Sequence, residues 1–261
     1  DGFVLQNTNA QLNASGGTYI YMAFADTRDA AFWRDTSGQN NDWQPNNLVF
    51  SDVVPDAPTN NFATWSPLAA NSSAQFREGN LEAAAADNRS VKASFNMPSG
   101  KWYWENRMDG GQPFVGICPE TMSADITPNG SGTDTVQYYF DGRVFINQVS
   151  QGNIGSYTTG DIIGITFDAS IHQVTFFKNN TQVGQYTAPD TDKIYVPFLS
   201  AGSVNAFVQG NFGQDSTFAG NETAGGNADE NGYGDFKYAV PSGFLSLCSA
   251  NLPSGAIDTL A

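Results

Sequence analysis

Residues 160–184, reading GDIIGITFDASIHQVTFFKNNTQVG, constrain the fold of this chain more than any other stretch. Apolar side chains recur at every second position from Ile163 to Phe167 and again at Val174 and Phe176. This period of two is typical of half-buried β-strands. A break at residues 169–170 separates the two runs, so the sequence predicts two antiparallel strands joined as a hairpin.

A second turn follows at Asn179 and Asn180. Asparagine tolerates the positive φ angles of tight hairpin turns, so we expect a third short strand through Val183. Composition agrees with an all-β chain, because aromatic residues make up 13% and charged residues only 14% of the sequence. The one stretch of helix-forming composition, residues 79–87, is too short for an independent helix, and we interpret residues 81–86 as a strand.

The two cysteines and the single histidine do not suggest a catalytic or metal site. Cys118 and Cys248 lie far apart in apolar strand patterns, which favours two buried free thiols, with a disulfide between them as the alternative. His172 falls in the second strand of the hairpin beside a polar residue, so we expect an exposed strand histidine. A Gly-x-Ser-x-Gly nucleophile motif is absent from the sequence.

Charge limits the classes of partner. The chain has 11 Lys and Arg against 26 Asp and Glu, a formal net charge of −15. Nucleic acids and anionic membrane surfaces attract clustered cations, so we expect neither as a partner. Membrane insertion is not expected, because no apolar run approaches the roughly 20 residues of a membrane span. The chain begins at Asp1, from which we expect a processed product or a fragment.

Three further stretches carry a family resemblance together with residues 160–184. They read GKWYWE at 100–105, NAFVQGNFGQ at 205–214 and PSGFLSLC at 241–248. In this order and at these separations they resemble the signature of the SPRY family. The resemblance extends over residues 62–252 and implies a concanavalin A-like jelly roll, a bent sandwich of two antiparallel sheets.

We divide the chain into four parts on these grounds. Residues 1–25 are interpreted as the terminal strands of an upstream domain or as an oligomer contact, because they include a run that is apolar on both faces. Residues 26–58 form a connector and residues 59–253 the SPRY-like sandwich. Residues 254–261 form a tail.

The connector has its own anchors and its own resemblance. Trp33 and Trp43 flank a cluster of turn residues, and we expect them to pin the connector to a neighbouring surface. The alternative is that they are stacking platforms for a sugar. The runs 34–47 (RDTSGQNNDWQPNN) and 56–68 (DAPTNNFATWSPL) resemble a module of tailed-phage fibre and appendage proteins from marine settings. Small departures occur, such as Gln39 at a usual asparagine.

The second resemblance implies a location and partners. It places the chain on the surface of a virion, as a non-enzymatic fibre, appendage or capsid-surface module that recognises a host surface glycan or protein. Such proteins usually assemble as homo-oligomers, most often trimers, and contact other virion proteins. The alternatives are a purely architectural head or tail protein and a carbohydrate-active enzyme on the same fold.

The sequence proposes one cluster for ligand recognition. Asp134, Tyr138, Tyr139, Asp141 and Arg143 combine aromatic faces with hydrogen-bonding groups. The alternative is that Tyr139 points into the core and the others form ordinary strand surface.

The longest stretch without strand pattern, residues 215–235, proposes a second site. Its cluster of Asp229, Glu230 and Asp235 offers the hard oxygen ligands that Ca²⁺ prefers. The spacing does not match the helix–loop–helix calcium motif, and a solvated acidic loop needs no ion. No other cofactor is suggested.

A glycosidase would need two carboxylates facing each other across the sugar. The strand at residues 102–108 offers Glu105 alone, which we interpret as half of a surface ion pair with Arg107. We therefore expect no enzymatic activity.

Overall fold

The chain divides into two compact units, residues 1–50 and 51–261, and the described residues belong to the second. The computed structural model describes residues 55–57, 59–85, 89–125, 133–201 and 206–252. The interpretations of residues 1–25, of most of the connector and of the tail lie outside the described residues.

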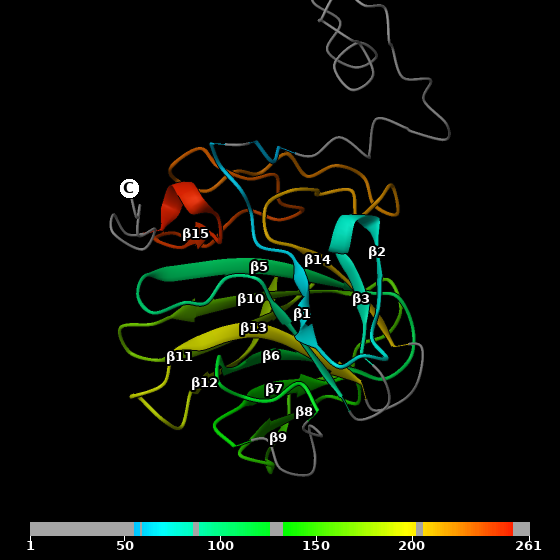
Figure 1. The fold of residues 1–261 in the computed structure, drawn as a ribbon, viewed down its shortest axis with the longest axis vertical. Helices are drawn as coiled ribbons and strands as arrows, with labels where there is room; N and C mark the ends of the chain where they lie inside the picture. The colour runs from blue at the N-terminus through cyan, green and yellow to red at the C-terminus, as the bar shows by residue number, and fades with distance from the viewer. Residues whose placement is uncertain (1–54, 58, 86–88, 126–132, 202–205, 253–261) are drawn as a thin grey trace, which may run out of the picture. The chain divides into compact units, whose positions relative to one another are not determined.

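Two sheets account for the strands of the described residues (Figure 1). The first sheet consists, in spatial order, of β1 (Trp65–Ala70), β4 (Ser90–Ala93), β13 (Tyr195–Ala201), β6 (Pro113–Pro119), β7 (Val136–Tyr139), β8 (Arg143–Ile146) and β9 (Val149–Asn153). The second consists of β12 (Thr181–Thr187), β11 (Gln173–Lys178), β10 (Ile162–Asp168), β5 (Lys101–Met108), β14 (Phe207–Asn211), β3 (Glu82–Ala84) and β2 (Gln75–Arg77).

The neighbouring strands of both sheets pair antiparallel. A short strand β15 (Leu245–Ser246) adds to β5 in parallel. Regular structure is completed by two 3₁₀ turns of the described chain, η2 (Glu78–Asn80) and η3 (Ser249–Asn251). The all-β, two-sheet antiparallel sandwich expected from the sequence is confirmed.

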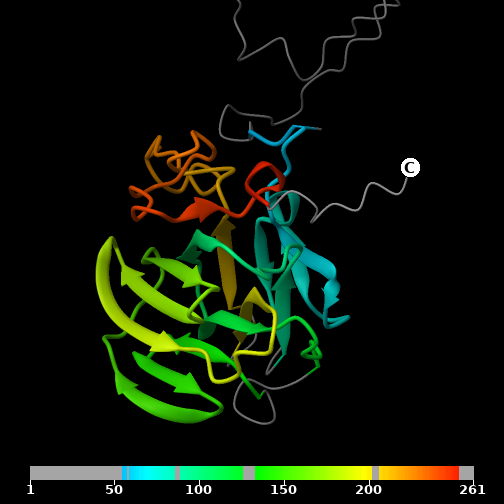
Figure 2. The same ribbon diagram turned by 90° about the vertical axis from the view of Figure 1, so that its left-hand side faces the viewer.

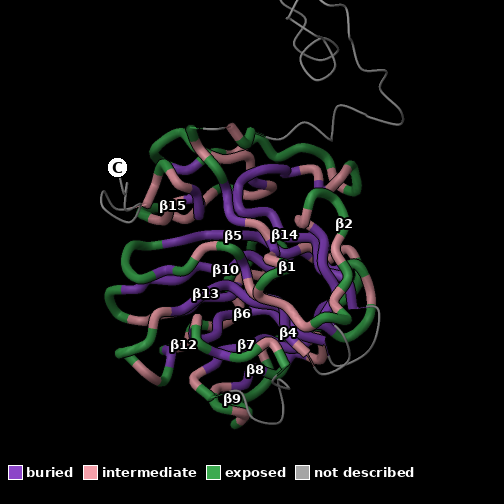
Figure 3. Tube along the Cα trace, viewed as in Figure 1, coloured by how far each residue is buried: buried purple, intermediate pink, exposed green. Residues whose placement is uncertain are grey.

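Aromatic side chains join the two sheets. Tyr138 of β7 packs on Phe176 of β11 with ring centroids 5.4 Å apart, and Phe167 of β10 packs on Tyr195 of β13 at 5.6 Å. Figure 3 shows the central strands of both sheets as buried along their length. Cys118 and Cys248 lie in this interior as buried free thiols, as expected.

The hairpin predicted from residues 160–184 is confirmed. β10 and β11 pair in register from Ile163 with Lys178 to Asp168 with Gln173, and β12 follows. The turn between β11 and β12 places Asn179 and Asn180 at φ 47° and 68°. Positive φ at both central residues is the mark of the tight turn that asparagine favours.

Two details of this hairpin differ from expectation. β10 is buried on both faces rather than half-buried. His172 lies in the β10–β11 turn at φ 52°, half-buried against the rings of Phe167 and Tyr195, and is not an exposed strand histidine.

Residues 82–84 form a buried strand of the second sheet, so the interpretation of this small-residue stretch as a strand is confirmed for its central part. No helix of the described residues is long and apolar enough to cross a membrane.

The Asn179–Asn180 turn supplies a test of the hairpin. Asn180 is exposed at φ 68°. Because glycine adopts this conformation without strain and a β-branched residue does not, Asn180→Gly should keep or slightly raise stability. Asn180→Val should lower it by about 1–2 kcal/mol. Urea unfolding of both variants measures the difference, and equal stabilities would contradict the turn.

Candidate binding site

Residues 215–238 form an ordered layer without regular strands on the outer face of β5 and β14. Figures 1 and 2 both place this segment beside the ends of these strands. Its first turn is built on Asp215, whose carboxylate accepts hydrogen bonds from Thr217 N and Oγ1 and from Ala219 N at 2.6–2.8 Å. Aspartate favours such turns because its carboxylate binds nearby backbone N–H groups. The long stretch is therefore held by its own side chains.

Glu105 of β5 anchors the end of this segment. Its side chain is 0% exposed, and its carboxyl accepts hydrogen bonds from the backbone N–H groups of Lys237 and Tyr238 at 2.9 and 2.8 Å. The Tyr103 hydroxyl and the Asn211 amide donate at 2.9 and 3.2 Å. Burial raises the pKa of Glu105 to about 7, against these hydrogen bonds, which favour the ionised form.

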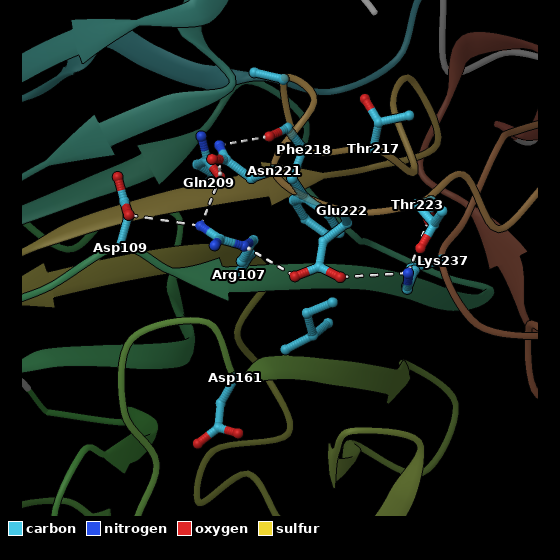
Figure 4. A network of polar contacts seen from close by, with 12 residues as sticks. Arg107, Asp109, Asp161, Gln209, Thr217, Phe218, Asn221, Glu222, Thr223 and Lys237 are labelled. Carbon is cyan, nitrogen blue, oxygen red and sulfur yellow. Dashed lines mark hydrogen bonds and ion pairs between the residues drawn. The ribbon is translucent and has the colours of Figure 1, made fainter.

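The interpretation of Glu105 and Arg107 as a surface ion pair is wrong. Arg107 instead lies between Asp109, at 3.5 Å, and Glu222, at 3.3 Å. Glu222 bridges to Lys237 at 3.3 Å, as Figure 4 shows. The network ties residues 215–238 to the sheet, because Arg107 belongs to β5 while its partner Glu222, and Lys237 that pairs with Glu222, belong to the segment.

Asp229 connects the segment to η3. One carboxylate oxygen accepts from the N–H groups of Asn231 and Tyr233, at 3.0 and 2.9 Å. The other accepts from Ser246 N and Oγ and from the Asn251 amide at 2.7–2.9 Å. Burial alone would raise the pKa of Asp229, but the bonds from Ser246, Tyr233 and Asn251 outweigh it and keep the pKa below its ordinary value.

The three acidic residues proposed for Ca²⁺ do not converge. Asp229 is saturated with protein donors, Asp235 accepts from Gly226 N at 3.0 Å, and Glu230 is exposed. Among the described residues no group of three or more His, Cys, Asp or Glu side chains is placed to hold a metal ion. The carboxylates of Asp229 and Asp235 instead order the chain by accepting hydrogen bonds from its own N–H groups.

A groove of about 650 Å³ lies beside η3. Its lining comes from the loop before β1, the edge strand β1, β4 and the residues after it, the residue after β6, β13, and η3 with the residue after it. The lining residues are Asn61, Ala69, Lys92, Ala93, Ser94, Phe95, Asn96, Pro98, Glu120, Val196, Ser249 and Leu252. This volume lies within the range of small-ligand sites, and the lining mixes apolar side chains with a few polar groups, as such sites do.

Hydrogen bonds hold both walls of the groove. Ser249 of η3 exchanges bonds with Asn61, donating from its N–H to Asn61 O at 2.8 Å and accepting from Asn61 N at its Oγ at 2.9 Å. On the opposite side the Asn96 amide donates to the Glu120 carboxylate at 2.6 Å. Asn251, pinned by Asp229, fixes η3 from behind. The groove is thus built before a ligand arrives, which lowers the entropy cost of binding.

The structure corrects the orientation of the two tyrosines in the first predicted cluster. Tyr138 points into the core with 0% exposure, so it is not a surface ligand group. Tyr139 points the other way and stacks on Phe114 at 3.8 Å. The Arg143 guanidinium lies over the rings of Tyr139 and Phe145, at 5.7 and 5.1 Å.

The remaining predicted residues separate. Asp141 and Arg143 form an ion pair at 2.6 Å in the β7–β8 turn. Asp134 precedes β7 and donates its N–H to the side chain of Asn147, in the β8–β9 turn, so the short β7 strand separates it from that pair. Trp33 and Trp43 lie outside the described residues.

Sequence reasoning missed the groove altogether. Its residues are single positions scattered from residue 61 to residue 252, and only the pairing of β1, β4 and β13 assembles them. The signal that existed was the neighbouring segment rich in Asp, Asn and Gly, whose Asx turns hold η3 in place.

The SPRY domain family matches residues 101–215 of the chain. This match supports the SPRY-like, concanavalin A-like fold expected from the sequence. It also supports a binding class of function, since SPRY domains are generally non-catalytic modules.

Solved structures similar to this chain include the SPRY domain of human HERC1, with 18% identity, 56% of this chain and 96% of that chain covered, and a TM-score of 0.49. Stonustoxin has 17% identity, 57% and 27% coverage and a TM-score of 0.48. The PSpry domain of TRIM65 has 13% identity, 57% and 87% coverage and a TM-score of 0.47. Among curated proteins none matches.

The buried carboxyl of Glu105 should make stability depend on pH. Its folded pKa of about 7 exceeds the ordinary value of 4.5, so the folded state holds the proton more tightly. The stabilisation is complete below about pH 4.5 and is lost as pH rises through about 7, by at most about 3 kcal/mol. The difference in unfolding free energy between the parent and Glu105→Gln, measured from pH 4 to 8, should fall accordingly. A flat difference would show that the carboxyl is ionised throughout.

Asp229 gives a second test. Asp229→Asn replaces an acceptor of five hydrogen bonds with a group that also donates, so we expect a loss of about 1–3 kcal/mol. Protease cleavage at residues 229–233 should become faster. The neighbouring exposed Glu230→Gln is the matched control and should change stability by less than about 0.5 kcal/mol. Equal behaviour of the two variants would contradict the anchoring role.

Proposed function

We propose that this chain is a non-enzymatic binding module of a virion surface that recognises a glycan or protein of the host cell through the groove beside η3. The observation that carries the proposal is the groove itself, about 650 Å³ and lined by apolar and hydrogen-bonding side chains. Sites with this mixture bind by apolar contact and gain specificity from a few polar groups.

The site's rigidity supports binding rather than a purely architectural role. Three buried or half-buried anchors, Glu105, Arg107 and Asp229, order the layer that holds η3. A merely solvated loop would not need them. Preorganised loops on a rigid scaffold are where binding residues concentrate in proteins.

The virion assignment rests on sequence alone. Residues 34–47 and 56–68 resemble a module of tailed-phage fibre and appendage proteins, which sets the proposed location on the particle surface. In this setting the module acts as a homo-oligomer, most often a trimer, attached to other virion proteins.

Binding of the labelled full chain to candidate host cells tests the function. Asn96→Trp should fill the groove at an exposed position and abolish cell binding, while the melting temperature stays near that of the parent. Gln151→Trp, on the exposed edge strand β9 of the same sheet, is the matched control and should bind normally.

Three outcomes would contradict the proposal. Equal binding by both variants would move the site elsewhere. The absence of binding by the parent chain would favour the architectural alternative. Release of reducing sugar from host polysaccharide by the parent chain would favour the glycosidase alternative.

A further inference from the structure

We infer that the groove beside η3 takes an uncharged glycan and rejects anionic ones; this rests on the proposed function and names its ligand class. The inference is carried by the state of the cations in the described part of the chain. Nine Lys and Arg side chains fall there, and each already has a partner within the chain.

Seven of the nine form ion pairs with carboxylates. These are Arg77 with Glu82, Lys101 with Asp168, Arg107 with Asp109 and Glu222, Arg143 with Asp141, Lys178 with Asp161, Lys193 with Asp190, and Lys237 with Glu222. The other two, Arg89 and Lys92, donate to backbone carbonyls. At seven of these nine cations an anionic sugar would compete with a carboxylate of the chain itself.

Among the described residues that line the groove, Lys92 is the only cation. Its ammonium donates to Glu120 O at 2.6 Å and to Met122 O at 2.8 Å, so it holds the β6–β7 connection against β4. These bonds use two of the three N–H donors of the ammonium and leave its charge in place. The Glu120 carboxylate lines the same groove, so the two charged side chains of the lining cancel and the groove has no net positive charge to attract an anionic ligand.

The remaining polar groups suit hydroxyl groups. Asn61, Ser94, Asn96 and Ser249 supply amide and hydroxyl side chains, which both donate and accept hydrogen bonds. The Glu120 carboxylate accepts from Asn96 through one oxygen, and no bond to its other oxygen occurs among the described side-chain contacts. A sugar hydroxyl can donate to such an oxygen, whereas a carboxylate, sulfate or phosphate would be repelled by it.

Apolar groups face the ligand from the same groove. These groups come from β1, the loop after β4, β13 and the residue after η3, and are the side chains of Ala69, Phe95, Val196 and Leu252 respectively. They provide surface for the C–H face of a sugar ring. The net charge of −15 adds a long-range repulsion toward polyanions that salt screens.

A glycan array with three arms tests the inference on the full chain. One arm holds neutral glucans, galactans and mannans, the second sialylated, uronic and sulfated glycans, and the third amine-bearing chitosan oligosaccharides. We expect retention on the neutral arm only. Affinity for the retained glycan should stay within twofold between 50 and 500 mM NaCl, because no ion pair contributes.

Variants tie the ligand to the groove. Asn96→Ala removes an exposed amide and should lower the affinity for the retained glycan by about tenfold. Gln151→Ala on β9 is the matched control and should leave affinity unchanged. Equal affinity of the Asn96→Ala variant and the parent would overturn the assignment to the groove.

The other outcomes each overturn the ligand class. Retention on the anionic arm does so directly. Retention on the amine arm that is lost in Glu120→Gln would show a cation site instead. No retention on any arm, with intact binding to host cells, would show a protein ligand and leave the proposed function standing; loss of cell binding as well would overturn the proposed function itself.

Discussion

The hydrogen bonds to the buried carboxyl of Glu105 are the contact on which the functional part of this structure depends. They join β5, through Tyr103, to β14, through Asn211, and both strands to the backbone at residues 237–238. A buried carboxyl is costly unless donors satisfy it, and here two of the four donors are backbone N–H groups of the outer layer. Removing that layer would expose the carboxyl's partners as well as the sheet.

A short series of polar contacts connects Glu105 to the groove and fixes the segments between them. The layer that ends at Glu105 contains Asp229, and Asp229 binds the Asn251 amide of η3. η3 in turn exchanges hydrogen bonds with Asn61. The loop before β1 and η3 therefore meet at the groove wall. Asp229 and Asp235, which the sequence suggested as calcium ligands, accept hydrogen bonds from backbone N–H groups in this part of the chain.

The sequence predicted the parts of the fold that local chemistry decides. The period of two and the Asn179–Asn180 pair are enough to define the β10–β11–β12 meander, because strand alternation and turn preference are local. It did not predict which of Tyr138 and Tyr139 points into the core, since this depends on the register of β7 against β6. Nor did it predict the burial of Glu105, because the covering residues lie more than 130 positions away. The groove could not be predicted either, because its lining residues come together only once the order of the strands in the sheet is known.

The central claim is that residues 215–238 are a rigid layer rather than a solvated loop. Native-state hydrogen exchange at the amides of Lys237 and Tyr238 tests it most directly, because both donate to Glu105. The account predicts protection comparable to that of the amides of β5. Exchange at the rate of an exposed loop, while β5 stays protected, would contradict it.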